Sequence, residues 1–217
     1  MGRDITLFMA DWGRLGTVPA AGRADALDDA ICALDHEDDY RGNELSGDWL
    51  RPPDRESAWC AEYVFRTTTG AYAPHVRAGN AWNDMRLLVD ASARGAMDSF
   101  LTGLILDADP TDGPSPDGGS APDGGSAPDG GILFPSAADP GVSCALLVCP
   151  PAAVSDKARA WKRVEPRLDE LREPFAAECE GWAGRPDTFE GFTALLREWG
   201  DVTADVARRG WGLVGLP

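Results

Sequence analysis

The sequence predicts an α+β fold: a small mixed sheet packed by several helices, in a single domain spanning residues 1–217. Three observations predict it. Short β-rich runs lie near both ends of the chain, and segments with apolar residues at helical spacing lie between them. Hydrophobic residues make up 43% of the chain, which is enough to bury a sizeable core.

The N-terminal part begins with a β-rich run, DITLFMA over 4–10, which predicts the first strand. Thr17 is expected to cap a helix, because apolar residues then recur at helical spacing as far as Leu34. The polar segment after that helix predicts a loop. Apolar residues alternate over 59–66, which predicts a strand with one buried face, and a turn at TTTG is expected to lead to a partner strand near Tyr72.

The middle of the chain predicts a helix and then an insertion. Apolar residues keep helical spacing from Asn80 to Leu104, with an expected break near Asp90. Residues 107–131 contain the repeated hexapeptide SAPDGG and almost no apolar side chain, so they cannot contribute to a core. This composition predicts a flexible, disordered Gly/Pro/Asp-rich loop within the domain. The apolar run SCALLVC over 143–149 predicts the next strand.

The C-terminal third has the clearest periodicity. Apolar residues advance by three and four from Val154 to Trp182, and two internal prolines predict two or three short helices or one kinked helix. Asp187 is expected to cap a further helix with Glu190 as its capping-box partner. Gly210 suits the left-handed residue that ends this helix, and WGLVGLP predicts a final strand.

This C-terminal pattern resembles the YfbM-like family of uncharacterised small bacterial proteins. The resemblance rests on a proline-led helix start, CPPAAVSDKARAWKRV, a second helical stretch, PRLDELREPF, and the closing helix and strand, FTALLREWGDVTADVARRGWGLVGLP. A looser similarity extends to the first strand and to AWNDMRLLVD. The family implies a compact α+β fold and no assigned activity, so it contributes no site residues.

The charge balance excludes several classes of partner. Twenty basic residues face 36 acidic ones, for a net charge of −16, whereas nucleic acids and anionic membrane surfaces require a cationic patch. The chain contains neither a membrane-spanning apolar stretch nor a signal-peptide pattern at its start. Five cysteines lack the short spacing of zinc sites, so reduced thiols in a cytoplasmic protein are expected.

Catalytic and cofactor motifs are absent from the sequence. It has no GxSxG, Walker A or GxGxxG segment, and its two histidines, His36 and His75, exclude a His-rich metal site. His36 lies in the acidic run DHEDDY, but adjacent side chains diverge in direction, so a solvated segment is a better interpretation than a metal site. We therefore predict no cofactor, no metal and no catalytic residues.

These observations favour a non-enzymatic, acidic protein-interaction module whose partner is a basic protein. Neutralisation of that partner, as immunity proteins achieve it, is one form of this hypothesis. The candidate contact residues are Trp49, Asp38 and Asp39, which lie in or beside the polar loop. The alternative is a small hydrolase or ligand-binding domain that uses carboxylates together with His36 or His75.

Overall fold

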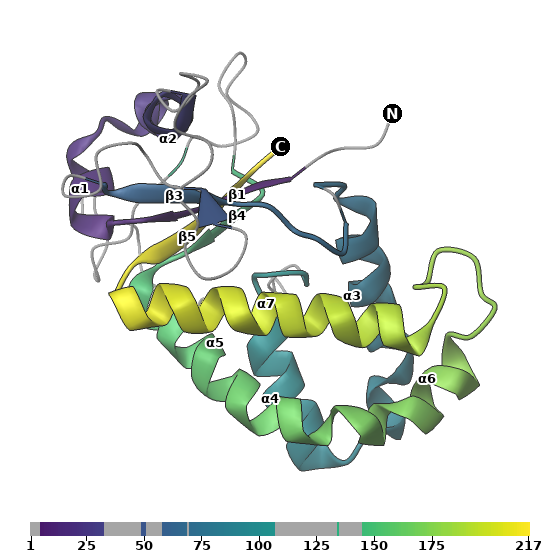
Figure 1. The fold of residues 1–217 in the computed structure, drawn as a ribbon. Helices are drawn as coiled ribbons and strands as arrows, with labels where there is room; N and C mark the ends of the chain where they lie inside the picture. The colour runs from purple at the N-terminus through teal and green to yellow at the C-terminus, as the bar shows by residue number, and fades with distance from the viewer. Residues whose placement is uncertain (1–4, 33–48, 51–57, 69, 107–133, 135–144) are drawn as a thin grey trace, which may run out of the picture.

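The computed structural model describes residues 5–32, 49–50, 58–68, 70–106, 134 and 145–217 (Figure 1). The predicted α+β class is confirmed: an antiparallel sheet is packed by several helices. The insertion predicted at 107–131 lies outside the described residues, as does the beginning of the strand predicted at 143–149.

The described strands form one five-stranded sheet in the order β2-β3-β1-β5-β4. Their bounds are Thr6–Ala10 (β1), Trp49–Leu50 (β2), Cys60–Tyr63 (β3), Leu147–Cys149 (β4) and Gly212–Leu216 (β5). Every pairing between these strands is antiparallel. The sequence analysis predicted a mixed sheet, and this detail was wrong. The central strand is β1, in which Phe8 pairs with Glu62 on one side and with Val214 on the other.

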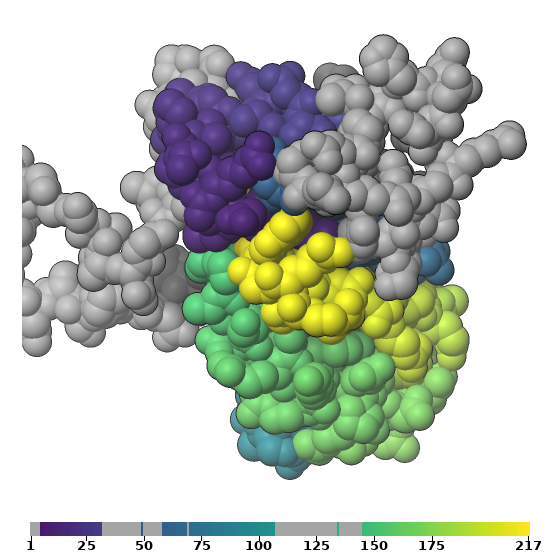
Figure 2. Space-filling model, turned by 60° about the vertical axis from the view of Figure 1, so that its left-hand side comes forward, coloured from purple at the N-terminus to yellow at the C-terminus, as the bar shows by residue number. Residues whose placement is uncertain are grey.

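Helices cover both faces of this sheet (Figure 1). Leu7 and Met9 of β1 belong to the larger core, whereas Phe8 and Ala10 belong to a smaller core together with Leu15 and other residues of the first two helices. Because successive side chains on a strand point to opposite faces, this division follows directly from the apolar run over 4–10. Figure 2 shows the C-terminal residues in yellow between the purple N-terminal helices and the green helical layer.

The first helical region differs from the prediction. Asp11 caps a short helix, α1 (Trp12–Thr17), by accepting a hydrogen bond from the Arg14 amide, so Thr17 ends a helix instead of starting one. Pro19 has no amide hydrogen to continue the helix, and α2 (Arg23–Cys32) begins after one 3₁₀ turn.

The hairpin predicted near Tyr72 is also wrong. After the turn at 66–68 the chain enters α3 (Ala73–Met85), with Pro74 in its first turn, and β3 pairs with β1 and β2 instead. The break predicted near Asp90 is confirmed. Asp90 caps α4 (Ala91–Leu101), which follows α3 and the 3₁₀ helix Arg86–Leu88.

The C-terminal helices agree best with the sequence analysis. They are α5 (Pro151–Val164), a 3₁₀ helix over Glu165–Leu171, α6 (Arg172–Glu178) and α7 (Phe189–Arg209). The N-cap of α7 is Thr188, one residue after the predicted Asp187, and Gly210 ends the helix with φ 68°. The predicted apolar stripe of α7 is buried throughout: Phe189, Phe192, Leu196, Trp199, Val202 and Val206.

Candidate binding groove

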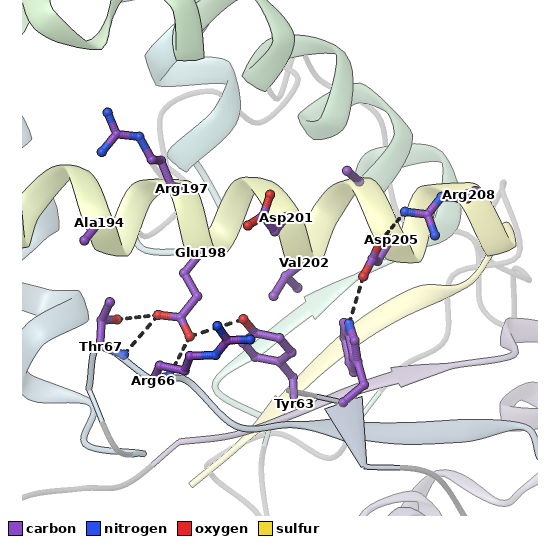
Figure 3. A pocket seen from close by; sticks show the side chains of 12 residues that line it. Tyr63, Arg66, Thr67, Ala194, Arg197, Glu198, Asp201, Val202, Asp205 and Arg208 are labelled. Atoms are coloured by element: carbon purple, nitrogen blue, oxygen red, sulfur yellow. Dashed lines mark hydrogen bonds and ion pairs between the residues drawn. The ribbon is translucent and has the colours of Figure 1, made fainter. Parts of the chain in front are cut away.

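A groove of about 600 Å³ runs between α7 and the end of β3 (Figure 3). We call it the α7 groove. Its lining combines aromatic side chains with several charges of both signs. The residues are Trp49, Tyr63, Arg66, Thr67, Ala194, Arg197, Glu198, Asp201, Val202, Ala204, Asp205 and Arg208.

Glu198 joins the two walls of the α7 groove. Its buried carboxylate accepts hydrogen bonds from the Tyr63 hydroxyl (3.2 Å) and the Arg66 amide (2.5 Å). It also accepts bonds from the Thr67 amide (3.1 Å) and the Thr67 hydroxyl (2.5 Å). A carboxylate with this many donors is fixed in position, so the turn after β3 is held against α7.

Asp201 and Asp205 continue the acidic face that Glu198 begins on α7. The three residues are three and four positions apart, which places them on one side of the helix. Asp205 accepts a hydrogen bond from the Trp49 indole nitrogen at 3.2 Å and forms an ion pair with Arg208. In the described part of the chain, the Asp201 carboxylate accepts no hydrogen bond and forms no ion pair.

The electrostatic environment of Asp201 is unfavourable to its charge. Partial desolvation raises the pKa of this carboxyl above its usual range, and nearby carboxylates, with Glu165 first, raise it further. Arg66 opposes the shift. The negative charge at this point of the α7 groove is therefore not fully compensated within the molecule.

Of the residues predicted to contact a partner, the structure places Trp49 alone. Trp49 is only 1% exposed, because its ring packs edge-on against Tyr63 at 4.8 Å. It supports the wall of the α7 groove and orients Asp205, but it does not present an exposed aromatic face. Asp38 and Asp39 lie outside the described residues.

His75 lies away from solvent in the aromatic core. It is 1% exposed, its Nδ1 accepts a hydrogen bond from the Trp199 indole at 3.0 Å, and its ring contacts Phe65 edge-on at 4.7 Å. Burial lowers the pKa of His75 to about 4. An enclosed neutral imidazole cannot reach a substrate, so the structure does not support the alternative in which His75 performs acid–base catalysis in a cleft. His36 lies outside the described residues.

The buried His75 predicts acid sensitivity. Unfolded histidine binds a proton near its ordinary pKa of 6.5, whereas the folded protein does not protonate His75 until about pH 4. The unfolded state therefore binds more protons in this window, and stability falls as the pH falls through it. Between about pH 7 and about pH 5.5 we expect a loss of about 1 kcal/mol from this group, measured by urea denaturation.

The matched variants are His75→Gln and His36→Gln. Glutamine can still accept the Trp199 hydrogen bond but does not titrate. His75→Gln should therefore reduce the dependence of the free energy of unfolding on pH between about pH 7 and about pH 5.5. His36→Gln should retain it. An unchanged slope in His75→Gln would show that another group is responsible.

Other chemistry has little support in the described residues. No group of three or more His, Cys, Asp or Glu side chains there has an arrangement that would hold a metal ion. Cys60, Cys149 and Cys179 are unpaired and buried, and burial raises the pKa of Cys149 to about 11, which disfavours a reactive thiolate. No helix in this part of the chain is long and apolar enough to cross a membrane.

The three acidic residues of the α7 groove were not predicted from the sequence. A signal for them was present, because Glu198, Asp201 and Asp205 form a second stripe beside the apolar stripe of the best-predicted helix. What the sequence does not show is that the turn after β3 lies opposite this stripe.

Comparisons with protein-family models, with curated proteins and with solved structures found no match.

Proposed function

We propose that this protein is a non-enzymatic, acidic protein-interaction module that binds a basic protein through the α7 groove. The observation that carries the proposal is Asp201, an acidic side chain at the groove without an ion-pair partner among the described residues, beside two carboxylates that are already fixed. An arginine or lysine of the partner would compensate this charge.

The α7 groove is organised before binding. Glu198 is held by the turn after β3 and Asp205 by Trp49, so the walls need little rearrangement when a cationic side chain enters. Fixed groups lose less conformational entropy on binding than mobile ones do. The rigid support of a 21-residue helix adds to this preorganisation.

The charges of the whole chain and of the α7 groove have different roles in this proposal. A net charge of −16 attracts a basic protein over a distance and accelerates the encounter. The groove also contains Arg66, Arg197 and Arg208, which would repel an unpatterned polycation. Binding would therefore select a partner with a particular arrangement of charges, as neutralisation of one basic protein in the cytoplasm requires.

A titration with a short peptide that carries one arginine flanked by neutral residues, followed by backbone NMR, tests the proposal. We expect saturable shifts at residues 66–67 and 197–205, and Asp201→Asn should weaken binding by about threefold or more, as for loss of one exposed ion pair. Asp25→Asn is the matched control, since it removes the same charge from α2, on the other face of the sheet. Equal weakening in both variants would mean that only net charge matters and that the α7 groove is not the site.

A further inference from the structure

A second groove lies between α4 and α5, which pack side by side (Figure 1). We call it the α4–α5 groove. Its volume is about 870 Å³. Its lining is rich in basic side chains, in contrast to the acidic chain as a whole. The residues are Asp98, Ser99, Thr102, Ala153, Asp156, Lys157, Arg159 and Arg163.

Both carboxylates of the α4–α5 groove already have cationic or N–H partners. Asp98 accepts hydrogen bonds from the Trp82 indole at 2.8 Å and from the Arg86 guanidinium at 2.7 Å. Asp156 forms an ion pair with Arg159 on the same helix. These pairings leave Lys157 and Arg163 as the cations of the lining that form no ion pair with a described carboxylate, although Asp156 interacts electrostatically with Lys157.

Lys157 is buried with unused hydrogen-bonding capacity. It is 8% exposed, and its ammonium donates to the Thr102 carbonyl at the end of α4. Among the described residues this carbonyl is its one hydrogen-bond acceptor, although an ammonium carries three N–H donors. Burial lowers the pKa of Lys157, which reflects the unfavourable free energy of a charge with too few partners. A bound anion would supply the missing acceptors.

Arg163 provides a second cation nearly two helical turns further along α5. It is exposed, and within the described residues it forms no ion pair. Its guanidinium is planar and can donate two parallel hydrogen bonds to one oxyanion. The Ser99 and Thr102 hydroxyls donate to carbonyls of their own helix, so the two cations are the main donors that the α4–α5 groove offers.

We propose that the α4–α5 groove binds a phosphate group, either as inorganic phosphate or as a small phosphomonoester. Two positive charges match the charge of a phosphate dianion, and both Lys157 and Arg163 line the groove that would receive it. The Asp98 and Asp156 carboxylates and the Thr102 carbonyl disfavour larger polyanions. This site is on different helices from the α7 groove and does not depend on the function proposed there.

Thermal unfolding of the full chain tests this proposal. Inorganic phosphate and methyl phosphate are titrated separately, with sodium chloride added to keep the ionic strength constant. Specific binding should raise the melting temperature with the logarithmic dependence of a single site. NMR shifts should appear at residues 99, 102, 157 and 163. Tighter binding of methyl phosphate than of inorganic phosphate would identify a phosphomonoester as the ligand. Tighter binding of inorganic phosphate would identify the free ion.

Two neighbouring variants decide between the site and a general salt effect. Arg163→Gln should weaken the apparent phosphate affinity about tenfold, as for loss of one charge-assisted contact. Lys162→Gln removes the same charge from the adjacent position, outside the α4–α5 groove, and should change the affinity less than twofold. Equal effects of the two variants would overturn the proposal. A rise in melting temperature that does not saturate with phosphate and that Arg163→Gln retains would also overturn it, because phosphate also stabilises proteins by exclusion from their surface.

Lys157→Met serves as a third variant and should abolish the saturable response. If losing the hydrogen bond to the Thr102 carbonyl prevents Lys157→Met from folding, Arg163→Gln still gives the decisive comparison. A folded Lys157→Met protein with unchanged phosphate affinity would contradict the assignment of Lys157.

Discussion

Replacing Trp199 with alanine should lower the free energy of unfolding by roughly 3–5 kcal/mol, the range for removal of a large buried aromatic side chain. Trp199 is completely buried on the apolar stripe of α7. Its ring lies 4.9 Å from that of Phe65 and 5.7 Å from that of His75, measured between centroids. The alanine variant loses these contacts and also leaves His75 Nδ1 without its 3.0 Å donor.

Trp182→Ala is the matched control, because the same atoms are removed from a side chain that is 70% exposed. Its free energy of unfolding should change by less than about 0.5 kcal/mol. Both values come from urea denaturation monitored by far-UV circular dichroism. A Trp199→Ala protein as stable as the parent would contradict the buried position of Trp199 and would suggest an interface residue instead.

The buried face and the end of α7 were predictable from the sequence for a simple physical reason. A long amphipathic helix encodes its buried face in its own spacing, and residues 189–206 repeat apolar side chains every three or four positions. Its end is also encoded locally, because Gly210 adopts a left-handed conformation that other residues disfavour. No partner element has to be known for either inference.

The wrong predictions of secondary structure and exposure lie where local sequence signals compete, or where packing against distant segments determines the structure. Over 11–23, Asp11 and Thr17 are both acceptable N-caps. The helix begins after Asp11, where Leu15 packs into the smaller core, and Pro19 follows its end. Near Tyr72 the chain could extend a hairpin, but the buried face of α3, with Ala78, Trp82 and Met85, favours a helix. Trp182 continues the apolar spacing of the preceding helices yet follows the end of α6, so its ring is exposed.

The α7 groove was beyond sequence analysis for the same reason. Glu198 and the Arg66–Thr67 turn are more than 130 positions apart, and no periodicity relates them. Their hydrogen bonds exist because β3 and α7 pack in the same core. Likewise, Trp49 was considered as an exposed contact, but its pairing with Tyr63 on the neighbouring strand encloses it.

Gly200→Ala should destabilise the protein by about 3 kcal/mol, although the general rule for helices predicts the opposite sign. Within an exposed helix, alanine is favoured over glycine by about 1 kcal/mol. At Gly200, however, an added Cβ would lie 2.1 Å from Cε2 of Trp161 and 2.2 Å from its Nε1. This indole cannot move aside easily, because it is 4% exposed and packs against Phe100 at 4.9 Å between ring centroids.

Gly95→Ala, in the interior of α4, provides the matched control for Gly200→Ala. Its added Cβ would meet no atom within 4 Å, so this variant should be more stable than the parent by about 0.4–1 kcal/mol. A double-mutant cycle with Trp161→Ala assigns the cause: if the overlap with the indole is responsible, Gly200→Ala should destabilise the Trp161→Ala background much less than it destabilises the parent. Equal destabilisation in both backgrounds would show that the contact between α5 and α7 is not what requires glycine at this position.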